Sequence, residues 1–520
     1  MVEVILAGQT IDTEFLRLLR QGELPPDIEP SPETISAAYA RISRFPESVT
    51  ELRAQARRDV PAARKSNRTI VFRMSHHSVA EHVQLNFDIL NTSRLAIEAL
   101  EEARLCSYTE KSQRYITLRG DYVRPVELKG DDLDLFERIT AEQVALYLKA
   151  FPILHELQKG KHPDMLGNKT DQETVEGWAK EDARYALNLA TEGQLGFSAN
   201  ARNLEYIVRK LRHHPLAEVR DLSRQLFDRG CEVVPSLIIL SDPVKFKEQF
   251  GKDISDGFMR DGRNKLEQLA SSALDGPVDT INERMLELLQ PVCYGRLEGD
   301  TKLVGYTPDA DTRIVAALIH SSARPLIPYG ECFAMAEGMK AEGRREFVKQ
   351  ALADLTAFDA VFREFEYARF LFEVNVSSTE FAQWKRHRMA TITKQPYDPS
   401  LGYTYPDSVV EAGLKQDYND LYDKTSEAFR KISASNPFAA EYVLANGHRR
   451  RMLADVSVRE LYHIARLRMD EHAQWDIRRT AGEMVKLAER VAPATVLLAC
   501  GKDEFASLRE KVYGSSCEDK

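Results

Sequence analysis

The sequence has few of the features that mark a secreted, membrane-bound or metal-binding protein. Its 520 residues include only six cysteines, which are scattered and form no Cys-x-x-Cys pair. This argues against a disulfide framework and a zinc site, and it favours a reducing compartment. No apolar run is long enough to cross a bilayer, and the first residues, MVEVILAGQTIDTEF, lack the basic segment and cleavage site of a signal peptide. We therefore expect no membrane partner and a cytoplasmic location.

An excess of basic residues and several common catalytic motifs are also missing. The net charge of −9 gives the chain no general attraction to nucleic acid, so any anion site must be a local cluster of arginines. The GxSxG, P-loop and GxGxxG patterns are absent from the sequence. His76, His77 and His82 stand near Glu81, but no further convergent ligand is evident, so we predict no metal.

What the sequence does contain is an internal repeat. Residues 76–94 parallel residues 362–379, and residues 183–220 parallel residues 440–478. We therefore predict one α+β domain, duplicated, with the two copies forming a pseudo-dimer. The predicted limits are 1–245 for the first domain and 301–515 for the second.

Other segments extend the repeat at lower similarity. VEVILAGQT followed by SPETISAAYARIS near the start, and TRIVAALIHSSA followed by YGECFAMAEGM past the middle, each predict a strand and then a helix. The connecting region 246–300 is charged and rich in turn signals. We interpret it as a linker with one helix, which begins near Thr280 and stops near Pro291.

Two segments carry the residues most suited to chemistry. Arg386-His387-Arg388 places two permanent charges beside an imidazole, an arrangement that is costly unless an anion or a polarisable ring compensates it. The segment ARLCSYTEKSQRY, from Ala103 to Tyr115, supplies carboxylate, hydroxyl, guanidinium and aromatic groups. We expect both segments to lie on the helix that follows the strand of their repeat.

A further predicted helix covers residues 460–479. On it Arg468, His472 and Trp475 would share one face, and Asp476 would orient the imidazole of His472. The alternative is a solvated amphipathic helix with Trp475 in the core. In the first half, Asn200 and Arg202 precede a helix that should end before Pro215.

Together these segments resemble the flavin-dependent thymidylate synthases. The resemblance covers most of both halves and rests on SVAEH, SYTEKSQRY, ANAR, EHAQWDIR and the Arg-His-Arg motif. It implies an α+β domain that assembles as a homotetramer, with active sites at subunit interfaces. It also implies the reductive methylation of dUMP to dTMP, with FAD as cofactor and with NADPH and methylenetetrahydrofolate as co-substrates.

Each half departs from the family pattern in a different place. The first half has Glu102-Ala103-Arg104 where the family has Arg-His-Arg, and the second half has Pro396 where the family has serine. Arg184 of the first half corresponds to Glu441 of the second, and a glutamate there would repel a phosphate dianion. We therefore expect one kind of hybrid site to survive, in a homodimer that mimics a tetramer.

The resemblance assigns roles to individual residues. Arg114 and Arg184 are the predicted catalytic residues. The predicted substrate-binding residues are Glu110, Ser112, Gln113, Arg114, Tyr115, Arg184, Arg212 and Arg468. The predicted FAD-binding residues are Ser78, Glu81, His82, Asn200, Arg202, Arg386, His387, Arg388, His472 and Gln474. Two alternatives stay open: a flavoprotein that acts on another pyrimidine nucleotide, and a non-catalytic, degenerate flavin- or nucleotide-binding protein.

Overall fold

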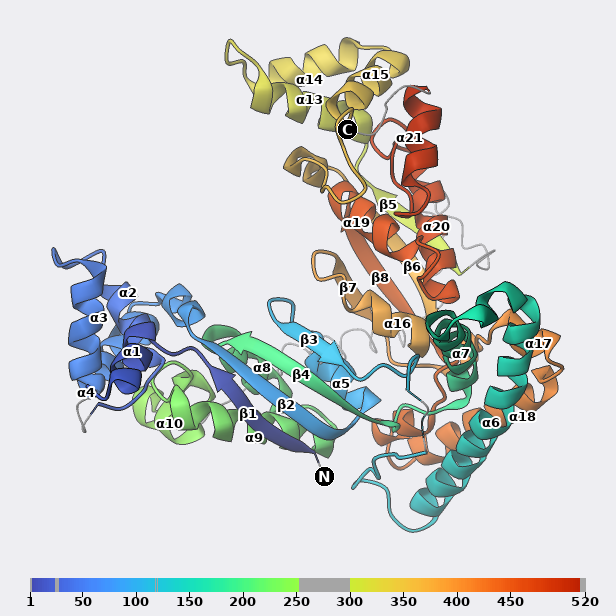
Figure 1. The fold of residues 1–520 in the computed structure, drawn as a ribbon, viewed down its shortest axis with the longest axis horizontal. Helices are drawn as coiled ribbons and strands as arrows, with labels where there is room; N and C mark the ends of the chain where they lie inside the picture. The colour runs from blue at the N-terminus through green and yellow to red at the C-terminus, as the bar shows by residue number, and fades with distance from the viewer. Residues whose placement is uncertain (1, 24–27, 117, 119, 252–299, 515–520) are drawn as a thin grey trace, which may run out of the picture.

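The chain folds into two halves, each built on a small antiparallel sheet packed against helices (Figure 1). The structure is a computed structural model, and it describes residues 2–23, 28–116, 118, 120–251 and 300–514. The α+β class predicted from the sequence is confirmed. The predicted linker helix after Thr280 lies outside the described residues. The predicted boundary at residue 245 falls within a helix, α10 (Pro243–Phe250), and the exact domain limits stay a prediction.

The two sheets have the same strand order, which is the clearest sign of the repeat. The first sheet is ordered β1-β2-β4-β3 and the second β5-β6-β8-β7. The strands of the first are β1 (Glu3–Gln9), β2 (Gln84–Ser93), β3 (Ser107–Glu110) and β4 (Glu192–Asn200). Those of the second are β5 (Thr301–Tyr306), β6 (Arg369–Ser377), β7 (Thr391–Lys394) and β8 (Arg449–Ser457).

Helices pack against both sheets. The α-helices of the first half are α1 (Thr13–Gln21), α2 (Glu33–Arg41), α3 (Val49–Arg58), α4 (Val60–Asn67), α5 (Arg94–Leu100), α6 (Asp131–Lys161), α7 (Lys169–Ala183), α8 (Ala201–Leu211), α9 (Ala217–Val233) and α10. Those of the second half are α13 (Ala310–Ser322), α14 (Tyr329–Gly338), α15 (Ala341–Ala351), α16 (Ser378–Trp384), α17 (Asp407–Glu411), α18 (Lys415–Ser433), α19 (Val458–Arg468), α20 (Trp475–Glu489) and α21 (Phe505–Tyr513). Within the described residues, none combines the length and apolarity needed to cross a bilayer.

Short local signals fix where the central helices begin. β2 and β6 end in Ser93 and Ser377, and each serine hydroxyl accepts a hydrogen bond from a backbone N–H of the following helix, α5 or α16. Serine is a favoured residue at this position because its side chain satisfies an orphan donor of the first turn. Asn200 and Ser457 cap α8 and α19 in the same way. The repeat is therefore built from the same strand-to-helix turns in both halves.

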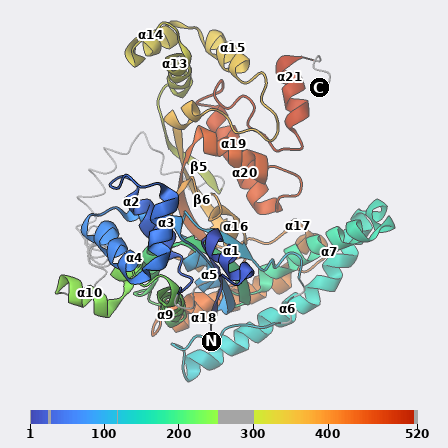
Figure 2. The ribbon, with the colours of Figure 1, turned by 60° about the vertical axis from the view of Figure 1, so that its left-hand side comes forward.

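The two halves share a buried core at their junction. α6 and α18 lie side by side (Figures 1 and 2). The buried rings of Tyr147 and Tyr185 belong to the same apolar cluster as those of Tyr418 and Tyr422. Since aromatic burial dominates core energetics, the halves form a permanent interface and not two independent domains.

Three local predictions are wrong. TRIVAALIHSSA is not a strand but part of α13, and the strand of that repeat is the preceding β5. The Ala103–Tyr115 segment and Arg386-His387-Arg388 do not lie on helices, because α5 and α16 end at Leu100 and Trp384; the first segment contains β3, and the second forms a turn that β7 follows.

The predicted continuous helix over residues 460–479 is also interrupted. α19 ends at Arg468 and α20 begins at Trp475, which leaves His472 in the connecting loop. The imidazole of His472 contacts Asp470, with 2.9 Å between Nδ1 and Oδ1, and not Asp476. Asp476 is buried and instead accepts a hydrogen bond from the Ser377 hydroxyl.

Candidate functional site

Five arginines from both halves gather where β3 and the Arg386–Arg388 turn meet. They are Arg94, Arg114, Arg184, Arg386 and Arg468, and we call them the arginine cluster. Arg94 and Arg184 are buried, whereas the side chain of Arg386 is 54% exposed. The cluster therefore runs from the interior of the junction to its surface.

Two carboxylates of the first half face this cluster. Arg386 lies 3.4 Å from Glu110, and Arg114 forms an ion pair with Glu181. Burial alone would raise the pKa of Glu110, but the charges of Lys385 and the nearby arginines outweigh burial and hold this pKa below its usual value. Five guanidinium groups thus face two carboxylates, Glu110 and Glu181, so positive charge is in excess in the cluster.

Burial and mutual repulsion act on the arginines themselves. Burial, with the charges of Arg94 and Arg114, lowers the pKa of Arg184 to about 10. Burial, with the charges of Arg386 and Arg114, lowers the pKa of Arg468 to about 10. The Nε–H of Arg184 is buried without a hydrogen-bond partner. A bound dianion would relieve both the repulsion and the unpaired donor.

Polar contacts across the junction hold the loop that follows β3, which contains Gln113 and Arg114, in place. Gln113 accepts a 2.9 Å hydrogen bond from Arg94 and a 3.4 Å one from Asn446 of the second half. Asn446 also donates to the carbonyl of Arg184 at 2.9 Å. Arg114 donates to the carbonyl of His472 at 3.2 Å. The two predicted catalytic arginines are therefore both tied to second-half backbone or side chains.

The Arg-His-Arg turn is held by α19. Arg468 donates through Nε to His387 Nε2 at 2.8 Å, which places the proton of a neutral imidazole on Nδ1, facing Glu460 at 3.4 Å. Burial and the nearby charge of Arg468 lower the pKa of His387 well below its usual value. Ligand atoms of His387, Glu460 and His463 come within 4.8 Å of one another, but a protonated Nδ1 does not ligate a metal, so we assign none there.

The two halves are related by an approximate twofold axis at this junction. Ser93 and Ser377 begin equivalent segments, so that residue numbers differ by 284 through the turn and the following strand. Arg388 donates to the carbonyl of Cys106, and its counterpart Arg104 donates to the carbonyl of Ala390. The counterparts Glu101 and Lys385 form a buried 2.5 Å ion pair with each other. The axis therefore passes between Glu101 and Lys385.

Buried tyrosines repeat the same symmetry. Tyr185 of the first half donates to Asp476, which also accepts a 2.7 Å hydrogen bond from Ser377. Tyr442 of the second half donates to Glu218, which accepts a 2.6 Å hydrogen bond from Ser93. Because Tyr185 and Tyr442 are equivalent, Arg184 and Glu441 beside them are equivalent too. The sequence correspondence of these two residues is thus reproduced in space.

The predicted FAD-binding residues fall into two groups. In the first half, Ser78, Glu81 and His82 lie in or at the end of a 3-10 helix (His77–His82), and Arg202 forms an ion pair with Glu81. Asn200 caps α8, and Asn203 in the first turn of that helix donates to the carbonyl of Leu105. In the second group, Arg386 to Arg388, Arg388 donates to the carbonyl of Cys106. The loop 103–106 is therefore contacted both from α8 and from the Arg-His-Arg turn.

A cavity of about 350 Å³ lies on the approximate axis. Its charged lining includes Arg104, Lys210, Lys385, Arg388 and Lys394, opposed by Glu101 and Glu102. Phe381 and Ile392 add apolar surface. This size is within the range of small-molecule sites.

The remaining predicted site residues lie in varied places. Tyr115 is 69% exposed, and Ser112 accepts a 3.1 Å hydrogen bond from the backbone N–H of Arg114. Gln474 is buried and donates to the Tyr185 hydroxyl at 2.7 Å. Arg212 donates to the carbonyl of Ser241 and lies over the ring of Phe227, contacts that are within the first half.

Several contributors were missed by the sequence analysis. Arg94 opens the mostly apolar helix RLAIEAL, where it was recognisable as a buried charge, whereas Glu181, one helical turn before Arg184, stands between the charged Lys180 and Asp182 and gave no distinct signal. Gln383 accepts a 3.3 Å hydrogen bond from Arg468. Asn446 gave no signal, because only the pairing of the two halves brings it to Gln113.

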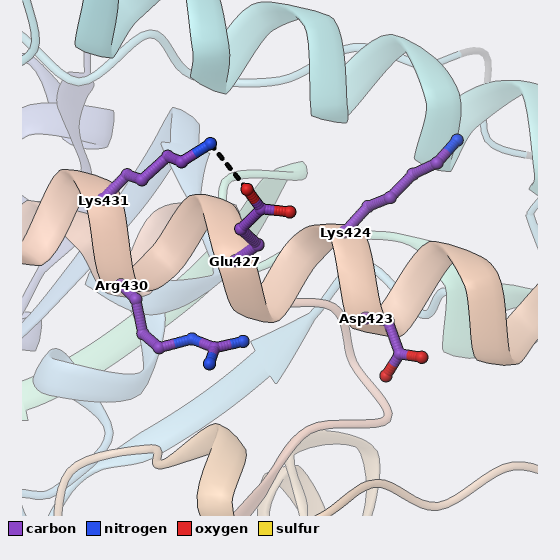
Figure 3. A pocket seen from close by; sticks show the side chains of 5 residues that line it. All are labelled: Asp423, Lys424, Glu427, Arg430 and Lys431. Atoms are coloured by element: carbon purple, nitrogen blue, oxygen red, sulfur yellow. Dashed lines mark ion pairs between the residues drawn. The ribbon is translucent and has the colours of Figure 1, made fainter.

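A shallow depression lies on the surface of α18. Asp423, Lys424, Glu427, Arg430 and Lys431 line it (Figure 3). Lys431 pairs with Glu427 at 2.6 Å, and Lys424 pairs with Glu142 of α6 at 2.7 Å. Most of these charges are compensated by neighbours, as on an ordinary solvated helix face, so we assign it no function.

Two repeated α+β halves therefore meet at a junction where arginines of both halves are gathered. The chain belongs to the family described as thymidylate synthase complementing protein, which matches residues 27–236 and 302–494.

Several known proteins are similar to this chain. The chain is 25% identical to a UPF0159 protein of Chlamydia muridarum over 449 residues, which covers 82% of this chain and 79% of that protein. It is 28% identical to a flavin-dependent thymidylate synthase of Clostridium tetani over 221 residues, covering 41% of this chain and 84% of the synthase. A crystal structure of the UMP/dUMP methylase PolB from Streptomyces cacaoi, bound with 5-Br dUMP, shares 17% identity at a TM-score of 0.31, covering 46% of this chain and 93% of that one.

Proposed function

We propose that this protein is an FAD-dependent, thymidylate synthase-like methyltransferase. It would methylate dUMP reductively to dTMP, with methylenetetrahydrofolate as the carbon donor and NADPH as the reductant. The observation that carries this proposal is the arginine cluster: among the described residues, its five guanidinium groups face two carboxylates, Glu110 and Glu181. Family membership supports the same class of reaction.

The residues of the cluster suit a nucleotide monophosphate. Arg114 and Arg184 present planar, permanently charged donors that match phosphate or pyrimidine oxygens in pairs. A guanidinium next to a uracil carbonyl oxygen would stabilise negative charge that develops on the ring during carbon transfer. Gln113, held by Arg94 and Asn446, would keep the loop and its Arg114 in position.

The residues beside the cluster fit a flavin dinucleotide. In the cavity on the approximate axis, Arg104 and Arg388 would meet a diphosphate, since Lys210, Lys385 and Lys394 are paired with Glu101 and Glu102; Phe381 and Ile392 offer apolar surface for a ring. Arg386, His387 and Arg388 would hold the cofactor, together with Ser78, Glu81, His82, Asn200, Arg202, His472 and Gln474. Bound FAD would supply the hydride that the reductive step requires.

A homodimer that mimics a tetramer remains our proposal for the assembly. It rests on the family resemblance, which implies a tetramer of single domains, and on the two matches to the family within this chain. Light scattering at working concentration tests the assembly, and a monomer would contradict it.

The main alternative is a flavoprotein that acts on another pyrimidine nucleotide. It is favoured by the replacement of one Arg-His-Arg motif with Glu102-Ala103-Arg104, where Glu102 pairs with Lys210 and Lys394. A non-catalytic flavin- or nucleotide-binding protein is the third candidate, since each half has lost part of the family motif.

Colour and tritium release distinguish these functions. The purified protein should show a flavin absorption spectrum or acquire one with added FAD. It should then release tritium from C5-labelled dUMP in the presence of methylenetetrahydrofolate and NADPH. Bound flavin without tritium release would indicate another substrate, and a protein that takes up no FAD would refute the proposal.

Single substitutions test the division of roles. Arg114→Ala should weaken dUMP binding at least tenfold with a smaller effect on FAD, because the lost guanidinium belongs to the nucleotide cluster. Arg388→Ala should do the reverse. Equal effects of both substitutions on both ligands would contradict the assigned roles.

A further inference from the structure

The approximate axis creates a second position that is geometrically equivalent to the arginine cluster. Its residues are the counterparts of the cluster residues across the axis. Arg94, Arg114, Arg184, Arg386 and Arg468 correspond to Ser378, Asp398, Glu441, Glu102 and Leu211. We call this second set the counterpart position.

None of the five guanidinium groups is conserved across the axis within the chain. Three of the five counterparts are carboxylates, which repel a phosphate dianion. Glu441 is partly buried, and burial raises its pKa to about 7 even though Arg450 opposes this. The counterpart position therefore lacks every cation that the arginine cluster offers to an anion.

The ion pair beside each position is reversed in sign. Arg386 of the second half faces Glu110 of the first at 3.4 Å. Their counterparts are Glu102 and Lys394, which pair at 2.8 Å. The same contact is thus made twice with exchanged charges, which indicates that the two positions differ in function and not in architecture.

Side chains of the second half occupy the counterpart position. Arg450, which corresponds to Gly193, places its guanidinium 3.7 Å from the centre of the Tyr397 ring and forms an ion pair with Glu98. Tyr397 donates to the other oxygen of Glu98 at 2.9 Å. All three side chains are almost completely buried. Lys394 also contacts Glu98 at 2.8 Å, so the carboxylates there are neutralised by cations of the chain itself.

We propose that each chain binds one pyrimidine nucleotide, at the arginine cluster, and that Arg450, Tyr397 and Glu98 permanently close the counterpart position. This inference rests on the proposed function. The closed position acts as a lock between the halves, because Glu98 belongs to the first half whereas Arg450 and Tyr397 belong to the second. The arginine cluster thus binds the ligand, whereas the counterpart position serves a structural role.

The stoichiometry of dUMP binding tests this proposal. Isothermal titration of the intact, flavin-loaded protein should give one dUMP per chain. Arg114→Ala should weaken this binding at least tenfold, whereas the matched substitution Asp398→Ala, at the counterpart of Arg114, should leave the affinity and the stoichiometry unchanged.

Other results would distinguish a failure of the single-site proposal from a failure of the proposed function. Two dUMP molecules per chain, or one that survives Arg114→Ala and is lost in Asp398→Ala, would overturn the single-site proposal while leaving the proposed function intact. No dUMP binding to the wild-type protein would overturn the proposed function, and the single-site proposal with it.

Discussion

At the scale of single residues, the junction buries charges that only a partner can make tolerable. Asp182 illustrates the cost. It is buried in the first half and accepts a 2.6 Å hydrogen bond from the Ser408 hydroxyl of the second. Burial raises its pKa to about 7, although this hydrogen bond opposes the shift. The protonated form is therefore favoured in the folded chain.

This shift makes a pH-dependent contribution to stability. A carboxyl group with a raised pKa stabilises the fold fully below its unfolded pKa, near 4, and the contribution is lost as pH rises through about 7. Asp182→Asn imitates the protonated acid and does not titrate. Relative to wild type, its free energy of unfolding should therefore rise by a few kcal/mol, about 4 at most, between pH 4 and pH 8.

Urea denaturation at several pH values measures this difference. Asp228→Asn is the matched control, because it removes a carboxylate from the exposed surface of α9. A difference between Asp182→Asn and wild type that stays constant from pH 4 to pH 8 would contradict the burial argument.

Residue chemistry was also the most predictable part of the site. The bare sequence showed that an acidic chain needs a local group of arginines to bind an anion, and Arg114, Arg184, Arg386 and Arg468 do gather. Asn446 and Gln383 were not predictable, since amides give no periodic signal and act only through partners that the fold supplies.

At the scale of elements, the order of strands and helices followed from the repeat, but several boundaries did not. Residues 460–479 have helical periodicity, yet Asp470 accepts a hydrogen bond from the backbone of His472, and Gln474 caps α20 by accepting one from Ile477. Side chains of this kind compete with the helix for backbone donors. The interruption sets His472 in a loop, where its carbonyl meets Arg114.

The strand predicted for TRIVAALIHSSA was wrong for a different reason. Ile314 to Leu318 are buried on all sides of α13, so the run has no polar face from which a period could be read. A short, continuous apolar run does not distinguish a buried strand from a buried helix. β5 has only six residues and precedes this run, and the sequence pattern did not identify it as the strand of the repeat.

The turns between the helices and the following short strands carry the contact on the approximate axis. Glu101 and Lys385 are both about 96–97% buried in this contact. Removing one partner of a buried ion pair leaves an uncompensated charge and costs about 3–5 kcal/mol, whereas removing both costs less. We expect Glu101→Gln and Lys385→Met each to destabilise the chain strongly, and the double variant to be more stable than the sum of the two effects predicts.

A double-mutant cycle by chemical denaturation gives this coupling energy. Lys149→Met and Asp417→Asn form the control cycle, because this pair also joins the two halves but is exposed. Coupling of about 1 kcal/mol or less at Glu101 and Lys385, as expected for an exposed pair, would contradict a contact buried on the axis.

At the scale of the whole molecule, two copies of one fold have become unequal partners. The shared tyrosine, carboxylate and serine contacts hold the halves together identically on both sides of the axis. The arginines, in contrast, are concentrated on one side. Each half alone therefore departs from the family pattern, while the junction gathers five arginines from both halves.

An excess of positive charge at the junction predicts stabilisation by anions. Inorganic phosphate should raise the melting temperature of the protein more than chloride does at equal ionic strength, because it binds the folded state alone. Arg184→Gln should reduce this gain, and Arg224→Gln, on the surface of α9, should not. Equal gains in both variants and the wild type would show that phosphate acts elsewhere.

The most direct test of the central claim is the dUMP affinity of variants that remove one arginine from each half. Arg114→Ala in the first half and Arg468→Ala in the second should each weaken dUMP binding by about tenfold or more, while Arg224→Ala, outside the cluster, should leave it unchanged. Losses in both variants would establish one site built by two halves of a single chain. A loss in only one of them, or in neither, would contradict the account.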